Sequence, residues 1–220
     1  MGVGPGWDAV PVRPRTSTVL LTCFEPFGGE AENTSEAAVA ALAARWAHDD
    51  VRLVTARLPV VFARVRDELA RLVEAHRPDA VVVTGEAGGR SVVTPETTAR
   101  NLDDARIPDN AGEQPRERVI DPGRPATTET RMDVPALLAA CARAGVPARA
   151  SEDAGTFVCN HAFHQVLALT DVPAGFVHVP AVCARGTAGI GAETDPDTAG
   201  APPEVTVEQN TERHRFEALV

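Results

Sequence analysis

The chain has 220 residues, of which 44% are hydrophobic and 24% charged, and its formal net charge is −10. These proportions suit one globular domain and argue against a largely disordered or fibrous chain. The basic residues are all arginines without a cluster, and no apolar stretch reaches the roughly 20 residues that span a bilayer, so neither nucleic acid nor a membrane is an expected partner.

The N-terminal residues 1–16 are rich in Gly, Pro and Arg without periodicity, and we expect a flexible extension there. They lack the pattern of a signal peptide, and the four cysteines contain no CxxC pair. Reduced thiols and a cytoplasmic location are therefore predicted.

The first half of the predicted domain, which spans residues 17–182, alternates strands and helices. Thr18–Cys23 predicts a buried strand, and Ser35 is expected to cap an alanine-rich helix over residues 35–48. A strand over Val51–Val60 follows, then an amphipathic helix, then a strand over Ala80–Thr84. The apolar face of the second helix comprises Val61, Val65, Leu69, Leu72 and Val73. The order β, α, β, α, β indicates an α/β fold.

Residues 85–131 are polar and rich in Gly and Pro, and they are predicted to form a long loop, which in a compact domain is usually functional. Asp133, Pro135 and Gly145 are typical start and stop signals of a helix. A further helix is expected just after Cys159, followed by a strand over Gly175–Pro180. Residues 183–220 are predicted to be a linker and a weak terminal helix.

Cys159 is the candidate nucleophile, because the positive end of a helix stabilises a thiolate and lowers the pKa of the thiol. Spacing alone equally allows a buried hydrophobic cysteine at this position. His178 would be held rigidly on its strand as a base, but His161 and His164 are also eligible partners.

A carboxylate that orients the histidine is expected to come from the long loop. Its candidates are Glu86, Glu96, Asp103, Asp104, Asp109 and Glu113. Zinc is the rival hypothesis, with Cys159, His161, His164, His178 and Cys183 as possible ligands. Their CxHxxH spacing matches no common zinc site, so no metal is expected.

Four segments, in order, resemble the signature blocks of pyroglutamyl peptidase I. They are LLTCFEPFGGEAENTSEAAVAAL, VVVTGEAGGRSVVTPETTARNLDDARIPDNAGEQP, AGTFVCNHAFHQVL and GFVHVP, and together they cover roughly residues 18–180. The resemblance implies a cysteine peptidase that removes N-terminal pyroglutamate from a small peptide or amide. It also implies an α/β/α sandwich around a twisted, largely parallel sheet, no cofactor, and self-association in several members.

The same resemblance implies a role for individual residues. Cys159, His178 and Glu96 would be catalytic, and Arg106 would lie close to the oxyanion site. The apolar lactam ring would be bound by Phe24, Phe27, Glu86, Phe157 and Val158.

The chain departs from the family pattern at Cys23, where Gly is usual, at Glu86, where Gln is usual, and at Thr34, where Pro is usual. An ionised carboxylate at residue 86 accepts hydrogen bonds but cannot donate them. Two alternatives therefore stay open: a thiol amidohydrolase of the same fold that acts on another small lactam or amide, and a catalytically silent relative that binds a ligand or partner.

Overall fold

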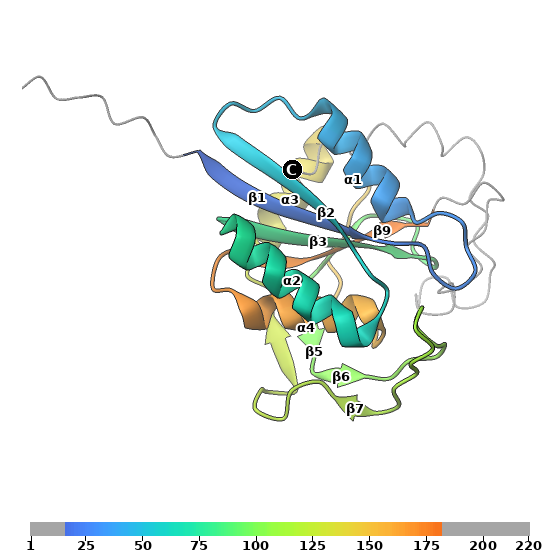
Figure 1. Cartoon of the computed structure of the whole chain (residues 1–220). Coiled ribbons are helices and arrows are strands. Elements are labelled where there is room, and N and C mark those ends of the chain that lie inside the picture. Colours follow the sequence, from blue (N-terminus) through green and yellow to red (C-terminus); the bar gives the residue numbers. More distant parts are fainter. Residues whose placement is uncertain (1–15, 182–220) are drawn as a thin grey trace, which may run out of the picture.

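A computed structural model describes residues 16–181, so the predicted extension (except Thr16) and the predicted C-terminal segment 183–220 lie outside the described residues. Its centre is a five-stranded sheet in the order β2-β1-β3-β9-β4 (Figure 1). The strands are β1 (Ser17–Phe24), β2 (Val51–Leu58), β3 (Ala80–Ala87), β4 (Thr94–Glu96) and β9 (Ala174–Pro180). The pairs β1–β2, β1–β3 and β3–β9 are parallel, and only β4 is antiparallel to its neighbour. The predicted α/β class with a largely parallel sheet is confirmed.

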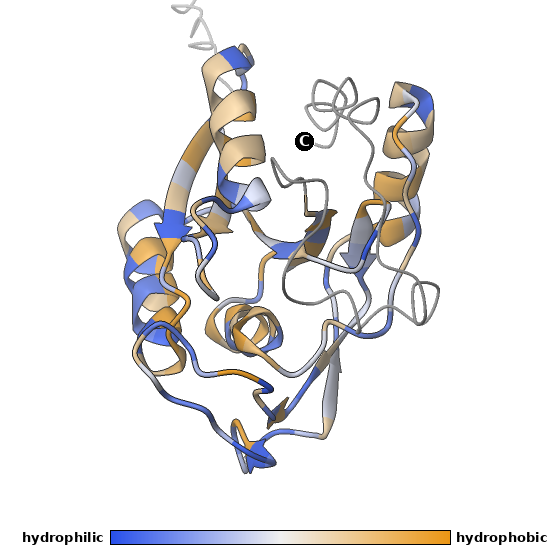
Figure 2. Cartoon of the chain, turned by 90° about the vertical axis from the view of Figure 1, so that its right-hand side faces the viewer, coloured by the Kyte–Doolittle hydropathy of each residue, from blue (hydrophilic) through white to orange (hydrophobic). Residues whose placement is uncertain are grey.

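Helices cover both faces of this sheet. They are α1 (Thr34–Arg45), α2 (Phe62–His76), α3 (Val134–Ala144) and α4 (Val158–Leu169). Helices α1 and α3 lie on one face, and α2 and α4 on the other (Figures 1 and 2). The largest apolar core joins α2 and α4 to the sheet through residues such as Leu69, Val83 and Phe163. None of the helices within residues 16–181 is both long and apolar enough to cross a membrane.

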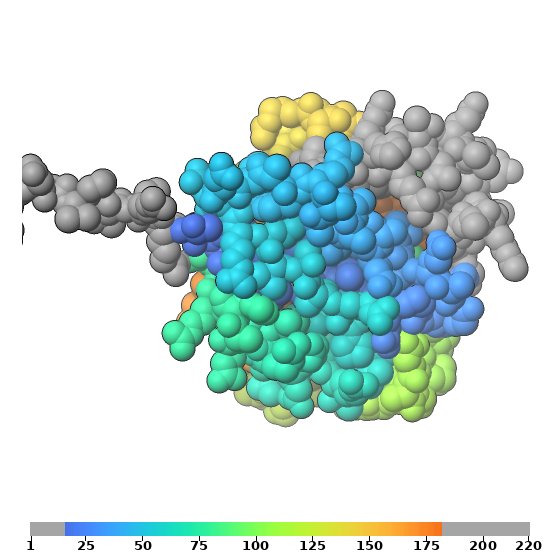
Figure 3. Space-filling model, turned by 45° about the horizontal axis from the view of Figure 1, so that its top comes forward, coloured from blue at the N-terminus to red at the C-terminus, as the bar shows by residue number. Residues whose placement is uncertain are grey.

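The edge strand β2 connects α1 and α2 along the chain, and these three elements form a continuous surface in the space-filling view (Figure 3). The apolar face predicted for the second helix is confirmed, with Val65, Leu69 and Leu72 buried. The helix begins at Phe62, and Val61 is its N-cap residue.

The cap predicted for the first helix is wrong. Asn33, not Ser35, is the N-cap residue of α1, and its side-chain oxygen accepts the backbone N–H of Ser35 at 3.0 Å. The Ser35 hydroxyl instead accepts the backbone N–H of Phe24 at 3.2 Å, and so ties the helix to the end of β1. The caps predicted for α3 are confirmed, since Asp133 accepts from the backbone and Gly145 is left-handed.

The prediction of a long loop over residues 85–131 is only partly right. β3 extends to Ala87, β4 completes the central sheet, and two small antiparallel pairs follow. These pairs are β5 (Thr98–Arg100) with β8 (Thr127–Glu129), and β6 (Leu102–Asp103) with β7 (Arg118–Val119). Strands of two or three residues are too short to show a periodicity in the sequence. Their partner strands also lie far along the chain, so no local signal predicts the pairing.

Candidate active site

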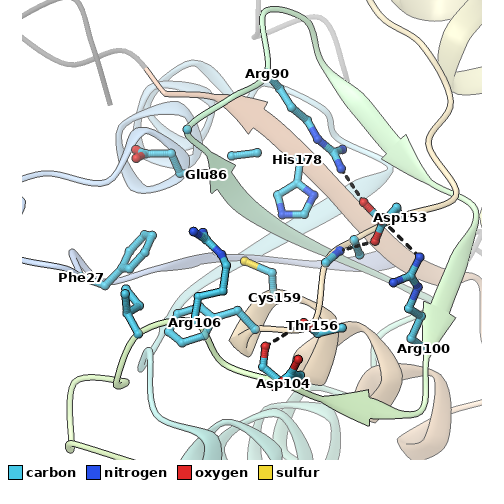
Figure 4. A pocket seen from close by; sticks show the side chains of 16 residues that line it. Phe27, Glu86, Arg90, Arg100, Asp104, Arg106, Asp153, Thr156, Cys159 and His178 are labelled. Carbon is cyan, nitrogen blue, oxygen red and sulfur yellow. Dashed lines mark hydrogen bonds and ion pairs between the residues drawn. The ribbon is translucent and has the colours of Figure 1, made fainter. Parts of the chain in front are cut away.

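Cys159 is the second residue of α4, whose N-cap residue is Phe157. Its sulfur lies against the backbone of β3, since a Cβ built on Gly85 would come within 3.0 Å of Sγ. The thiol lines a pocket of about 290 Å³ together with His178, Glu86 and Arg106. Figure 4 shows the sulfur facing this space. The predicted position of Cys159 near a helix N-terminus is confirmed by the start of α4 at Val158.

The direction predicted for the pKa of this thiol is wrong. Burial raises the pKa of Cys159 to about 12, and the negative charges of Glu96 and Glu86 add to the rise while Arg90 opposes it. The loss of hydration favours the neutral thiol over the thiolate. The resting residue is a neutral thiol that must lose its proton to a base before it can attack.

His178 is the histidine beside this thiol. In the register of the sheet it lies opposite Gly85 on β3 and Thr94 on β4, and its side chain is 5% exposed. Figure 4 shows its imidazole next to the Cys159 side chain. Burial lowers the pKa of His178, although the hydrogen bond to Glu96 acts in the opposite direction. The imidazole is thus neutral at rest and can accept a proton.

Glu96 fixes the orientation of this imidazole. Its Oε1 lies 2.7 Å from Nδ1 of His178, and the carboxylate is fully buried. Burial by itself raises the pKa of Glu96, but the hydrogen bond from His178 and the charge of Arg90 hold it below its ordinary value. An ionised Glu96 accepts the Nδ1–H bond, which leaves Nε2 of the imidazole as the proton acceptor.

Arg90 is a site residue that the sequence prediction missed. Its guanidinium contacts Glu96 Oε1 and Thr94 Oγ1, and it donates to the carbonyl oxygen of Asp153 at 2.5 Å. The side chain is 10% exposed, so it neutralises the buried Glu96 in a largely dry environment. An arginine six residues before a carboxylate gives no periodic signal that could have identified it.

Replacing Arg90 by methionine is expected to lower the free energy of unfolding by about 3 kcal/mol, because Glu96 would stay buried without its cation. Urea denaturation at pH 7 measures this loss. The double variant Arg90→Met/Glu96→Gln serves as control, since removal of the charge should recover part of the loss. Equal stability of Arg90→Met and the unmodified chain would contradict this role for Arg90.

The residues predicted to bind the ring gather beside the thiol. A smaller pocket, here called the ring pocket, is lined by Phe24, Phe27, Asn33, Val60, Glu86, Phe157, Val158 and Cys159. The rings of Phe27 and Phe157 are tilted by 36° to each other, with their centroids 6.0 Å apart. All five predicted binding residues therefore lie around one apolar space next to the candidate nucleophile.

Arg106 lines the larger pocket, and Figure 4 shows its side chain close to Cys159. Its loop is fastened by Gln114, whose amide donates to the backbone oxygens of Ala105 at 3.1 Å and Arg106 at 2.8 Å. The Arg106 guanidinium is therefore a cation held in the pocket close to the Cys159 sulfur.

The other two histidines lie elsewhere. Nδ1 of His161 lies 3.0 Å from both oxygens of the buried Asp103, which also binds Arg118 at 2.9 Å. His164 is 1% exposed, and burial lowers its pKa. Neither His161 nor His164 lines the pocket with Cys159.

The zinc hypothesis finds no support within residues 16–181, where no three His, Cys, Asp or Glu side chains cluster as ligands. Its candidate Cys183 lies outside the described residues. Cys23 and Cys141 are buried free thiols, and burial raises the pKa of each, that of Cys23 to about 11.

The site therefore holds a thiol beside a neutral imidazole. The other imidazole nitrogen is hydrogen-bonded to a buried carboxylate, and this arrangement is typical of cysteine hydrolases. Comparison with known proteins agrees with this class. The family model described as pyroglutamyl peptidase matches residues 17–210, and the chain belongs to this family.

Pyrrolidone-carboxylate peptidases are among the relatives. The protein of that name from Gloeobacter violaceus is 46% identical over 166 residues, which cover 74% of this chain and 80% of the relative. The one from Levilactobacillus brevis is 45% identical over 167 residues, which cover 74% of this chain and 81% of that relative. The crystal structure of pyroglutamyl peptidase I from Bacillus amyloliquefaciens superposes with a TM-score of 0.75 at 33% identity, covering 92% of this chain and 95% of that one. These comparisons confirm the resemblance and favour a peptidase over the two alternatives.

Proposed function

We propose that this protein removes an N-terminal pyroglutamate residue from small peptides and amides, with Cys159 as nucleophile, His178 as general base and acid, and Glu96 as the orienting carboxylate. The observation that carries the proposal is the position of Cys159. It lies between the apolar ring pocket and the buried His178–Glu96 pair.

In the first step Nε2 of His178 takes the thiol proton while Sγ attacks the carbonyl carbon that follows the ring. The carbonyl oxygen becomes an oxyanion, which the Arg106 guanidinium and backbone N–H groups at the start of α4 stabilise. His178 then gives its proton to the departing amine, and the carbonyl re-forms as a thioester.

In the second step a water molecule gives a proton to His178 and attacks the thioester. The thiolate leaves, takes the proton back from His178, and pyroglutamic acid is released. Glu96 stays ionised and stabilises the imidazolium that forms in both steps. The buried ion pair of Glu96 with Arg90 keeps that carboxylate from protonating.

The pH dependence of kcat/KM is expected to follow the protonation of His178. As the pH falls through the lowered pKa of His178, the imidazole becomes protonated and cannot accept the thiol proton. We therefore expect the acid limb of kcat/KM to have an apparent pKa below 6.5, the ordinary value for histidine. Rates at low substrate concentration between pH 4 and 9 measure it, and an acid limb centred above pH 7 would contradict a neutral resting imidazole.

A cytoplasmic location is consistent with the free thiols of Cys23, Cys141 and Cys159. Self-association stays a prediction, which sedimentation of the purified chain tests.

The proposed function is tested by release of a fluorescent amine from a pyroglutamyl amide, with alanyl and glutamyl amides of the same amine as controls. We expect turnover of the pyroglutamyl amide only. Absence of turnover by folded protein, or equal turnover of the alanyl amide, would reject the proposal.

A further inference from the structure

Asn160, the residue after the candidate nucleophile, is fully buried, and its side-chain amide holds the chain where β5 ends and β6 begins. Its Oδ1 accepts the backbone N–H of Arg100 at 2.8 Å. Its Nδ2 donates to the backbone oxygens of Arg100 at 2.9 Å and Leu102 at 3.0 Å. The amide therefore accepts once and donates twice, which fixes its orientation.

Thr156 holds the same part of the chain, three residues before Cys159. Its hydroxyl donates to the backbone oxygen of Asp104 at 2.8 Å, and its carbonyl oxygen accepts the backbone N–H of Asp104 at 3.0 Å. Figure 4 shows Thr156 and Asp104 joined at the edge of the pocket. Residues 100, 102 and 104 are thus bonded through their backbones to residues on both sides of Cys159.

Arg106 lies two residues beyond this bonded segment. Its guanidinium and the Cys159 sulfur line the same pocket, although they belong to distant parts of the chain. A hydrogen-bond donor stabilises an oxyanion best at about 2.7–3.1 Å, so the relative position of these two side chains has to be fixed closely. The bonds made by Asn160 and Thr156 fix the backbone before Arg106 to the backbone around Cys159.

We propose that Asn160 and Thr156 are positioning residues of the reaction, which hold the Arg106 guanidinium at the oxyanion that forms when Cys159 attacks. They act through the backbone of residues 100–104. This inference rests on the proposed function and adds how the cation of its oxyanion site is placed.

Asn101 provides a matched control in the same segment. It is 7% exposed, and its amide makes the same pattern of bonds as that of Asn160. Its Oδ1 accepts the backbone N–H of Asp121 at 2.8 Å, and its Nδ2 donates to the oxygens of Asp121 at 2.7 Å and Arg124 at 3.0 Å. Replacing either asparagine by alanine removes similar bonds, but only the loss of Asn160 frees the segment from α4.

The first measurement is kcat and KM for a pyroglutamyl amide. Arg106→Ala should lower kcat at least about 100-fold, because an oxyanion donor is lost. Asn160→Ala should lower kcat at least about tenfold with KM within about threefold, whereas Asn101→Ala should keep kcat within about threefold. Urea denaturation should show similar losses of stability in the two asparagine variants, so a purely structural role would affect their kcat values equally.

Combined variants test whether the effect passes through Arg106. In the Arg106→Ala background, Asn160→Ala should lower kcat no more than about twofold, because the group that it positions is absent. Thr156→Val, which removes one bond and nearly keeps the side-chain shape, gives the same test should Asn160→Ala fail to fold. It should lower kcat about fivefold, and Thr156→Ser, which keeps the hydroxyl, should recover most of this loss.

A second readout needs no substrate. Cys159 is alkylated with iodoacetate, an anion, and separately with iodoacetamide, its neutral counterpart, and peptide mapping by mass spectrometry gives both rates at this residue. Their ratio, called here the anion preference, reports the cation beside the sulfur, while changes in the reactivity of the thiol cancel. Arg106→Ala should lower the anion preference at least about fivefold. Asn160→Ala and Thr156→Val should each lower it at least about threefold, and Asn101→Ala should leave it within about 1.5-fold.

Equal losses of kcat in Asn160→Ala and Asn101→Ala would overturn the proposal, as would fully additive effects of Asn160→Ala and Arg106→Ala. Absence of turnover together with the expected pattern of anion preferences rejects the proposed chemistry and supports the positioning residues. An anion preference that ignores residues 156 and 160 overturns the positioning role whatever the turnover.

Discussion

Replacement of Cys159 by alanine is expected to lower kcat/KM for a pyroglutamyl amide by at least about 10⁴-fold, because no other group in the pocket can form the covalent intermediate. Cys159 is only partly buried and lines the pocket, so its replacement by the smaller alanine should keep the fold. Steady-state hydrolysis with purified variant protein, and far-UV circular dichroism as a check of folding, measure the two effects.

The matched controls are Cys23→Ala and Cys141→Ala. Both thiols are buried in apolar clusters away from the pocket, so kcat/KM should stay within about threefold of the unmodified value while stability falls modestly. Activity that survives in Cys159→Ala, or vanishes in a folded Cys141→Ala protein, would place the nucleophile elsewhere.

Replacement of Glu96 by glutamine is expected to lower kcat about 10³-fold to 10⁴-fold, with a much smaller change in KM. A neutral amide neither stabilises the imidazolium of His178 nor guarantees that Nδ1 carries the proton. Because the substitution is nearly isosteric, the geometry around His178 should be retained. Initial rates over a range of substrate concentrations separate kcat from KM.

Asp103→Asn provides a matched control for this variant. Asp103 is as fully buried as Glu96 and is likewise bonded to a histidine, His161, but it does not line the pocket with Cys159. Its replacement should reduce stability through the loss of the Arg118 and His161 bonds, with kcat nearly unchanged. Similar kcat losses in the two variants would show that Glu96 acts only through the fold.

Much of the fold could be predicted because its elements carry local signals. The alternating buried strands and the apolar stripe of Val65, Leu69 and Leu72 are visible in the sequence. The strand order was not predicted and comes from the structure. The short strand β4 carries no such signal, since Pro95 within it argues against a strand unless the strand lies at an edge. Its existence depends on the distant strand β9, which pairs with it.

The candidate site, like the fold, could be predicted only in part. The resemblance identified Cys159, His178 and Glu96, and the structure brings them to one place. Spacing along the chain could not choose His178 over His161, because the partner of each histidine comes from a different loop strand.

The direction of the Cys159 pKa could not be predicted either. It depends on burial and on two carboxylates far along the chain, whereas only the helix N-terminus is visible locally. In the sequence, Thr34 and Glu86 are two separate departures from the family pattern. In the structure they are joined by a hydrogen bond, and Glu86 lines the ring pocket.

The central claim is that hydrolysis proceeds through a pyroglutamyl thioester on Cys159. The most direct test is to mix the protein with excess pyroglutamyl ester, quench the mixture in acid within the first turnovers, and map the modified peptide by mass spectrometry. We predict one pyroglutamyl group on the peptide that contains Cys159, and none on this peptide in Cys159→Ala. Turnover with no acyl group on Cys159, or with the group on another residue, would contradict the claim.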